Sequence, residues 1–573
     1  MLKRLVVGRV AGVLLVAAAL WGCVPPGGES DGSQPSSGMA DESGLGAYLA
    51  GRFAQSHGDT SAAADFFVTA ARRDPDNIDL QQRAFTLLLA EGRLDEAAPL
   101  AERLLTIDDD APLPSVLLGL IDARDGQFNA AEKRFGALPH KGINAFLGPL
   151  LTAWARVGQR DFDGALKMLA PKADTKGFAP IYEYHAGMIA DLAGKAAEAE
   201  GHFKAALSAQ TSVRTVEAVG AFYQRAGRPE AAQALYDRYQ TEHADRALLD
   251  GRRQLAMGAA IPRPVETAAD GLAETMFDTA SLLRQGSAND LVLVFTRLAL
   301  TVRPDFPLAQ LLLADTLTQQ ARLSEANAIY GAIDRGRQES GFARLRRAIN
   351  LDEAGDTDAA ISELQSLTAE RGDAYDAPMA LGDVLRRHKR FVEAASAYDQ
   401  ALERAGGSAE PRNWALYYAR GITLERSHQW PKAEKDFLEA LRLKPDQPDV
   451  LNYLGYTWVD QGHNVEKGRK LIERAVELRP NDGAIVDSLG WALYRMGEYQ
   501  QAVKLLERAA ELKAEDPTIN EHLGDAMYQV GRTAEARYQW QRAMTLDPEP
   551  EQIEALRAKI SSGQLPPPAK IQK

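Results

Sequence analysis

Small and apolar residues recur at fixed distances through most of this 573-residue chain. Counted from Gly51, Ala63 lies twelve residues on, Phe67 sixteen, Ala70 nineteen and Pro75 twenty-four. The small residues Gly51 and Ala63 let two helices approach closely. The aromatic ring of Phe67 fills the gap to the next pair of helices. Proline ends the second helix because it lacks the N–H that helical hydrogen bonds need. The pattern therefore predicts pairs of antiparallel helices.

This pattern keeps its phase along nearly the whole chain. Thirteen repeats are readable, almost every step between them is 33 to 35 residues, and a divergent fourteenth surrounds Ala280. Unrelated amphipathic helices do not hold one phase for hundreds of residues. The positions equivalent to Gly51 are Phe85, Gly119, Ala153, Gly187, Gly220, Ala314, Ala348, Gly382, Gly421, Gly455, Gly490 and Gly524.

The spacing resembles the tetratricopeptide repeat, a helical hairpin of about 34 residues. The resemblance implies an all-α fold, an α-solenoid of about 13–14 such hairpins. In such solenoids each hairpin contacts its neighbours, and the stack creates a concave binding surface. We expect the first helix of each hairpin to line that surface.

The phase is interrupted between Gly220 and Ala314, where Pro262 and Pro264 each restrict the preceding residue. We expect two solenoid blocks joined by this break, and one continuous superhelix with an irregular repeat is the alternative. The expected segments are a signal peptide (1–22), a lipidated tether (23–44), an N-terminal block (45–255), the break (256–266), a C-terminal block (267–548), a polar-faced capping helix (549–562) and a disordered tail (563–573).

The N-terminus carries the features of a secretion leader. Lys3, Arg4 and Arg9 precede an apolar run that ends at Cys23, the only cysteine of the chain. The run is too short to span a bilayer, which needs about 20 apolar residues. The sequence Leu-Trp-Gly-Cys at 20–23 resembles the bacterial lipobox. That resemblance implies cleavage before Cys23, attachment of diacylglycerol to its sulfur and acylation, for example with palmitate, of the new N-terminus.

Two alternatives to this interpretation are a transmembrane anchor and an ordinary cleavable leader with a chance cysteine. Residues 24–44 are rich in Pro, Gly and Ser, which is typical of a flexible tether. Val24 follows the cysteine where bacterial lipoproteins retained at the inner membrane carry Asp. We therefore expect a lipid anchor at the periplasmic face of the outer membrane in the cell envelope.

Charge and motifs exclude several kinds of function. The formal net charge is −13, and the leader carries three positive and no acidic residues, so the mature chain is more acidic still. Nucleic acid is an unsuitable partner because its affinity depends on neutralising phosphates with basic groups. The nine histidines show no zinc-binding spacing, and no nucleophile or phosphate-binding motif is complete. We expect no catalytic residues, no metal and no cofactor, and hence no enzyme.

The candidate partner-binding residues follow from helical geometry. On a first helix the inner face should carry residues about three and six before the reference position and one, four and five after it. Around Gly455, Gly490 and Gly524 this set is rich in Trp, Tyr and Arg, which often dominate binding energy. The candidates are Asn452, Tyr456, Asp487, Trp491, Tyr494, Arg495 and Tyr528. The alternative for Tyr456 and Trp491 is packing between helices.

The last repeats carry a narrower resemblance. Leu-Asn-Tyr-Leu-Gly-Tyr at 451–456, Asp-Ser-Leu-Gly-Trp at 487–491 and Glu-His-Leu-Gly-Asp at 521–525 are similar to the closing repeats of a family of proteobacterial lipoproteins. That family includes the lipoprotein binding partner of a carboxyl-terminal processing protease. The resemblance implies a scaffold that recruits and activates a periplasmic protease that trims cell-wall hydrolases. The alternative is a structural assembly factor for outer-membrane biogenesis or polysaccharide export. In both cases the partners are proteins or extended peptides.

Overall fold

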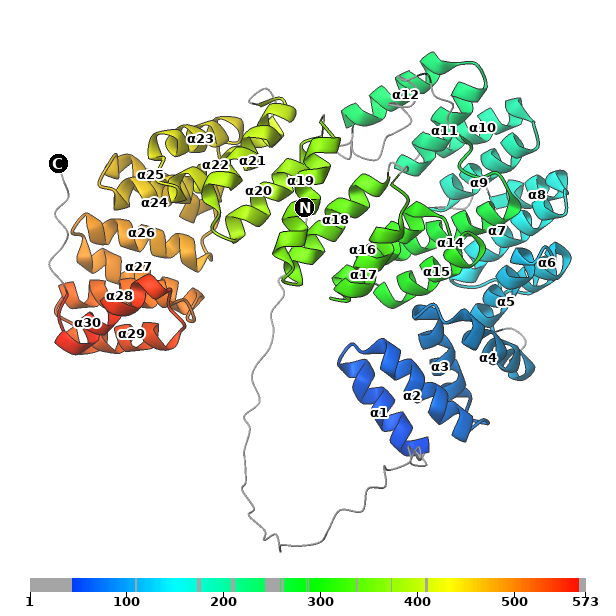
Figure 1. Ribbon diagram of the computed structural model, residues 1–573, viewed down its shortest axis with the longest axis horizontal. Coiled ribbons are helices and arrows are strands. Elements are labelled where there is room, and N and C mark those ends of the chain that lie inside the picture. The colour runs from blue at the N-terminus through cyan, green and yellow to red at the C-terminus, as the bar shows by residue number, and fades with distance from the viewer. Residues whose placement is uncertain are drawn as a thin grey trace, which may run out of the picture.

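The computed structural model describes residues 44–565, apart from 109–110, 173–176, 208–211, 243–257, 259–261, 285, 287, 336–338, 373 and 408–410. These residues form twenty-nine α-helices and two short 3-10 helices, with no strand in the described part (Figure 1). Cys23, the leader and nearly all of the tether lie outside the described residues, as do the end of the tail and residues 256–257 and 259–261 of the expected break.

The helices fall into two runs along the chain. Those before the break are α1 (Gly44–Ser56), α2 (Thr60–Arg73), α3 (Ile78–Ala90), α4 (Leu94–Ile107), α5 (Pro112–Arg124), α6 (Phe128–Gly136), α7 (Ile143–Gly158), α8 (Phe162–Leu169), η1 (Ala170–Lys172), α9 (Ala179–Leu192), α10 (Ala196–Leu207), α11 (Val213–Arg225) and α12 (Pro229–Glu242). Those after it are α14 (Ala268–Arg284), α15 (Asn289–Val302), α16 (Pro307–Gln319), α17 (Leu323–Ala332), α18 (Glu339–Glu353), α19 (Thr357–Glu370), α20 (Asp376–Arg387), α21 (Phe391–Arg404), η4 (Pro411–Asn413), α22 (Trp414–Arg426), α23 (Trp430–Leu443), α24 (Pro448–Asp460), α25 (Val465–Leu478), α26 (Gly483–Arg495), α27 (Tyr499–Leu512), α28 (Pro517–Gln529), α29 (Thr533–Thr545) and α30 (Pro550–Ser562).

Consecutive helices pack as antiparallel hairpins. In the described residues, α1 to α12 form six hairpins and α14 to α29 form eight. Every reference position of the sequence pattern, including the divergent Ala280, lies in the first helix of its hairpin. The prediction of an all-α solenoid of about 13–14 hairpins is confirmed.

The turn inside each hairpin has a recurring backbone conformation. In the described turns, the residue seven positions after the reference has a positive φ, as at Gly58 (78°) and Gly126 (80°). Glycine adopts this left-handed conformation without steric cost, which explains its frequency there. Arg160 (66°) and Lys389 (59°) take the same conformation without being glycine. The turn geometry is therefore imposed by the packing of the two helices as well as by the residue type.

The close approach within a hairpin depends on the small residue at the reference position. A Cβ atom added to Gly119 would lie 2.4 Å from the ring of Phe135, sixteen residues on. Added to Gly421 it would lie 2.7 Å from the ring of Phe437. Both rings are buried. Each aromatic side chain therefore occupies the space that the glycine leaves.

We expect Gly119→Ala to lower the free energy of unfolding by about 1–3 kcal/mol, because the added methyl group overpacks a filled core. Gly136→Ala is the matched control, since a Cβ there meets no atom within 4 Å. The control should leave stability unchanged or raise it by up to about 1 kcal/mol. Denaturant unfolding of both variants checks this, and equal stabilities would contradict the packing argument.

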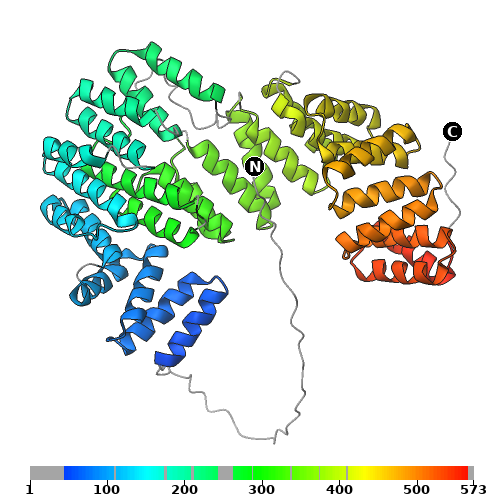
Figure 2. The ribbon, with the colours of Figure 1, turned by 180° about the vertical axis from the view of Figure 1, so that it is seen from behind.

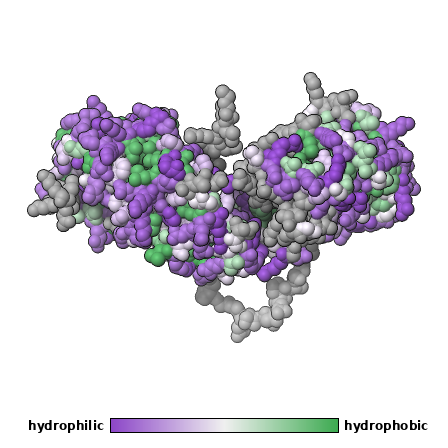
Figure 3. Space-filling model, turned by 90° about the horizontal axis from the view of Figure 1, so that it is seen from above, coloured by the Kyte–Doolittle hydropathy of each residue, from purple (hydrophilic) through white to green (hydrophobic). Residues whose placement is uncertain are grey.

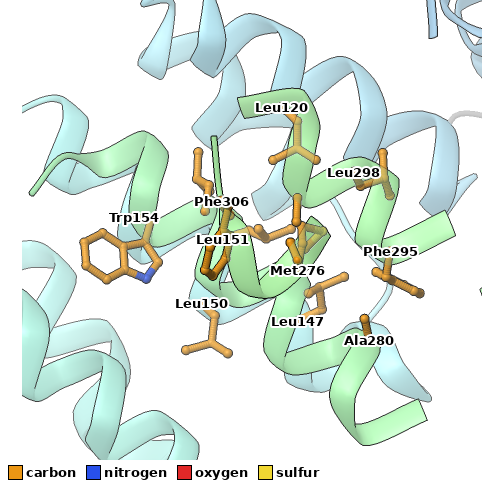
Figure 4. Packing of buried hydrophobic residues seen from close by; sticks show 14 of the residues in the cluster. Leu120, Leu147, Leu150, Leu151, Trp154, Met276, Ala280, Phe295, Leu298 and Phe306 are labelled. Carbon is orange, nitrogen blue, oxygen red and sulfur yellow. The ribbon is translucent and has the colours of Figure 1, made fainter. Parts of the chain in front are cut away.

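The chain does not continue as a simple stack after α12. The hairpin α14–α15, which we call the inserted hairpin, contacts α3, α5 and α7, far earlier in the sequence. Figure 4 shows Met276, Ala280, Phe295 and Leu298 of this hairpin beside Leu147 and its neighbours. One hydrophobic cluster runs from Ala54 to Ala343 and includes residues from both sides of the expected break. The two sides therefore share one core, whereas the break itself at residues 256–266 stays a prediction.

Polar contacts fix the inserted hairpin in place. Glu274 is fully buried and accepts hydrogen bonds from Arg214 Nε (2.7 Å) and from the Tyr184 hydroxyl (3.1 Å). Nearby, Trp154 Nε1 lies 2.8 Å from Nδ1 of His185. At the other end of the block, Arg322 of α17 donates to Glu91 at 2.6 and 2.8 Å. These contacts join hairpins that are far apart in the sequence.

The later hairpins, from α18 to α30, extend away from this shared core (Figures 1 and 2). Their buried residues form several smaller clusters, each limited to neighbouring hairpins. The surface seen from above is largely hydrophilic, with hydrophobic residues in small groups (Figure 3). In the described chain, the main contacts of α24, α26 and α28 are with helices of their own and the adjacent hairpins.

Candidate partner-binding site

The seven candidate residues lie on three successive first helices. Asn452 and Tyr456 are on α24, Tyr528 is on α28, and the other four are on α26. These helices contact one another in the order α24, α26, α28. We call their shared inner side the C-terminal face. The structure thus brings the candidates together, but whether they bind a partner stays a prediction.

Trp491 is the centre of an aromatic stack. Its ring is stacked on Tyr494 (centroids 4.7 Å apart, 13° between planes) and on His522 of α28 (4.0 Å, 14°). His522 is buried, and its Nδ1 lies 3.0 and 3.1 Å from the two carboxylate oxygens of Asp487. The stack therefore joins two hairpins.

Arg495 has an internal partner one hairpin away. Its Nη1 donates to Oδ1 of Asp460 at 2.7 Å, and its Nη2 donates to the carbonyl oxygen of Asp460 at 3.0 Å. The bridge links α24 to α26 in the same way that Asp487 and His522 link α26 to α28. Arg495 and Asp487 thus hold the face rigid and contribute charge to it.

Two buried polar atoms of the C-terminal face lack a hydrogen-bond partner among the described residues. They are the Asn452 carbonyl oxygen Oδ1, an acceptor, and the Trp491 Nε1–H, a donor. An unsatisfied buried group costs about 1–3 kcal/mol, so such groups call for an explanation. An extended peptide carries both a backbone N–H and a backbone carbonyl that could satisfy them.

The Tyr456 hydroxyl is largely buried and lies near several carboxylates. Burial raises the pKa of the Tyr456 hydroxyl, and the nearby carboxylates of Asp460 and Asp487 raise it further. The phenol is therefore neutral at physiological pH and acts as a hydrogen-bonding group.

The last helix closes the C-terminal face. Lys559 of α30 is buried and donates to Asp525 Oδ1 and Oδ2 (both 2.8 Å) and to Glu521 Oε1 (2.7 Å). Burial disfavours the ammonium, but the charges of Asp525 and Glu521 outweigh it and raise the pKa of Lys559. Tyr528 lies against Trp540, with ring centroids 5.9 Å apart.

The sequence prediction missed His522 and Lys559 as members of this region. Each pairs with a carboxylate on a neighbouring first helix: His522 follows Asp487 by 35 residues and Lys559 follows Asp525 by 34. Opposite charges one repeat length apart are therefore the signal that could have identified them.

We expect the Asp487–His522 pair to make the last hairpins sensitive to high pH. Burial lowers the pKa of His522, but the charge and hydrogen bond of Asp487 outweigh it and raise the pKa above its usual 6.5. The ion pair therefore contributes its full stabilisation of the folded state below pH 6.5. This contribution is lost as the pH rises through the folded-state pKa of His522. The thermal midpoint should fall with rising pH more steeply in wild type than in His522→Phe. Equal slopes in both proteins would contradict this.

Neither a metal site nor a membrane-spanning helix is found in the described residues. None of their helices combines the length and apolarity needed to cross a bilayer. In the same part of the chain, no group of three or more His, Cys, Asp or Glu side chains is placed to hold a metal ion.

Comparison with known sequences agrees with the architecture. Tetratricopeptide-repeat profiles match residues 54–112, 345–409, 418–483 and 488–549. Together with the hairpins, these matches define an α-solenoid, a class of helical-repeat scaffold. The repeats resemble tetratricopeptide repeats, a kind of repeat that implies protein–protein interaction and is typically non-catalytic.

Individual relatives cover only part of the chain. The TPR repeat-containing protein PA4667 of Pseudomonas aeruginosa is 31% identical over 161 residues, 28% of this chain and 26% of that protein. A probable UDP-N-acetylglucosamine–peptide N-acetylglucosaminyltransferase, SPINDLY of Petunia hybrida, is 27% identical over 99 residues, 17% of this chain and 10% of that protein. The chain thus matches about a quarter or less of the length of these relatives.

Among solved structures, the APC/C hetero-tetramer Cut9–Hcn1 aligns with 90% of this chain and 96% of its own. The TM-score is 0.37 and the sequence identity 13%, and a likeness at this level carries no functional argument.

Proposed function

We propose that this chain is a lipid-anchored scaffold of the bacterial envelope that recruits and activates a periplasmic protease and presents the protease's cell-wall hydrolase substrates. The lipobox-like sequence ending at Cys23 supports the anchor. The resemblance of the closing repeats to the lipoprotein family supports the choice of partner. The scaffold would work by tethering, since two proteins held on one solenoid meet at a raised effective concentration.

The observation that carries the proposal is the C-terminal face with its two unsatisfied polar atoms, Asn452 Oδ1 and Trp491 Nε1. On the inner side of the N-terminal hairpins, the protein's own inserted hairpin supplies contacts such as Arg214–Glu274. On the C-terminal face, the described residues supply no hydrogen-bond partner to Asn452 Oδ1 or Trp491 Nε1. A partner segment that donates to Asn452 and accepts from Trp491 would recover the hydrogen bonds that the free protein lacks.

The test is affinity purification of the lipidated protein from its own membranes, followed by mass spectrometry of the retained proteins. Trp491→Phe keeps an aromatic ring in the stack but removes the N–H donor. Combined with Asn452→Ala, it should weaken partner binding about tenfold or more, because a net hydrogen bond contributes about 0.5–1.5 kcal/mol. Tyr538→Ala is the control, since Tyr538 lies on α29 with 72% of its surface exposed.

The expected result is a carboxyl-terminal processing protease that wild type and the control retain and that the folded double variant loses. Retention of an outer-membrane barrel or a glycan synthase in place of a protease would favour the assembly-factor alternative. An unchanged set of partners in the double variant would contradict the role of Asn452 and Trp491 and assign both to packing.

A further inference from the structure

Helix α1 carries a stripe of exposed apolar side chains. Leu45, Leu49 and Phe53 are 68%, 57% and 66% exposed, and their spacing of four residues places them on one side of the helix. The opposite side, with Ala47, Gly51 and Ala54, is buried in the contact with α2. We call these three exposed residues the α1 stripe.

The two ends of the solenoid differ in the polarity of their exposed side chains. The last helix, α30, presents polar or charged residues to the solvent, such as Glu554, Arg557 and Ser561. Terminal units of repeat proteins usually have such polar outer faces, which keep the array soluble. The α1 stripe is an exception to this rule, so we expect another surface to cover it.

A second copy of the chain is an unsuitable occupant. Stable protein–protein interfaces use roughly 20–30 residues on each side, whereas the stripe offers three large side chains. A surface this small contributes usefully only where another link already holds the two partners together.

The position of α1 points to such a link. Twenty residues separate Cys23 from Gly44, where α1 begins, and they can span at most about 70 Å. If Cys23 is acylated, α1 is the part of the folded body that is bound most directly to the bilayer. Helix α1 also contains no acidic residue, although the whole chain has a net charge of −13. Its only charged residue, Arg52, is exposed.

We infer that the α1 stripe is a second membrane contact, which inserts into the interface of a phospholipid bilayer and orients the solenoid on it. This inference rests on the lipid anchor of the proposed function. The several lipid chains on Cys23 would already hold the protein at the bilayer, so the stripe serves to orient the solenoid rather than to supply the anchoring itself. The stripe adds apolar surface at the point where the tether meets the folded body, and it fixes which end of the solenoid faces the membrane.

The test places an environment-sensitive fluorophore on α1. Because Cys23 is the only cysteine and the thioether bond to diacylglycerol consumes its thiol, Phe53→Cys gives a single reactive site in the lipidated full-length protein. Tyr538→Cys is the matched control, with 72% exposure in wild type against 66% for Phe53, on a helix near the other end. Both proteins are reconstituted in phosphatidylcholine vesicles with and without brominated acyl chains.

We expect brominated lipid to quench the probe at position 53 at least twofold and to leave the probe at 538 unchanged. Leu45→Ser with Leu49→Ser should abolish the quenching at 53. Equal quenching at positions 53 and 538, or no quenching at 53, overturns the inference. The lipid anchor is tested separately by mass spectrometry, where an added lipid mass on Cys23 supports it. A blue shift in the emission of the probe at position 53 without quenching also overturns the inference, because it shows that a second copy or another protein covers the stripe. An unmodified Cys23 overturns the anchor and this inference together.

Discussion

Glu274→Ala should lower the free energy of unfolding of the N-terminal hairpins by about 3–5 kcal/mol. The substitution leaves the Arg214 guanidinium, which is mostly buried, without its carboxylate partner, and removing one member of a buried pair has this cost. It also removes the acceptor of the Tyr184 hydroxyl. The inserted hairpin should therefore detach, and hydrogen exchange of α14 and α15 should become much faster.

Two further variants separate the charge effect from a general loss of packing. Glu266→Ala removes an exposed carboxylate just before α14 and should change stability by less than about 0.5 kcal/mol. Arg214→Met with Glu274→Leu replaces the pair by apolar side chains and should recover much of the loss. If Glu274→Ala were as stable as Glu266→Ala, the inserted hairpin would not depend on this pair.

The same pair predicts the response to acid. Burial disfavours the charged form of Glu274, but the charge and hydrogen bonds of Arg214 outweigh it and lower its pKa below the usual 4.5. Its stabilising effect is thus complete above pH 4.5 and is lost as pH falls through the lower folded-state value.

Lys559→Ala should destabilise the C-terminal end by a similar amount, about 3–5 kcal/mol, because it leaves the carboxylates of Asp525 and Glu521 buried without a cation. Stability in repeat proteins is largely a sum over neighbouring units, so the loss should be confined to the last hairpins. Hydrogen exchange should therefore accelerate in α28, α29 and α30 and remain unchanged in α14.

Arg557→Ala tests whether this effect belongs to the ion pairs. Arg557 lies in the same helix but is exposed, and its removal should change exchange little. Equal acceleration in both variants would show that α30 depends on helix propensity rather than on Lys559.

The repeating part of the fold could be predicted from the sequence because its contacts are local and periodic. Gly119 and Phe135 are sixteen residues apart and meet within one hairpin, and the same relation recurs at Gly421 and Phe437. The helices that carry the candidate site follow from the same periodicity. The reference positions alone place Tyr456 and Trp491 on adjacent first helices.

The inserted hairpin could not be predicted in this way. Tyr184 and Glu274 are 90 residues apart, which is no multiple of the repeat length of 33 to 35 residues, so the periodic pattern does not relate them. Periodicity likewise does not say which side chains pair across hairpins. The stacking of Trp491 on His522 and the bridge from Arg495 to Asp460 determine how much of each candidate remains available to a partner.

Site-specific photocrosslinking in intact cells can show whether the C-terminal face binds the proposed partner protein. A benzoylphenylalanine at position 456, on α24, should form a covalent adduct with the partner protein, and the same residue at position 538 should not. An adduct at position 538 with none at 456 would place the partner on the outer side and contradict binding at the C-terminal face.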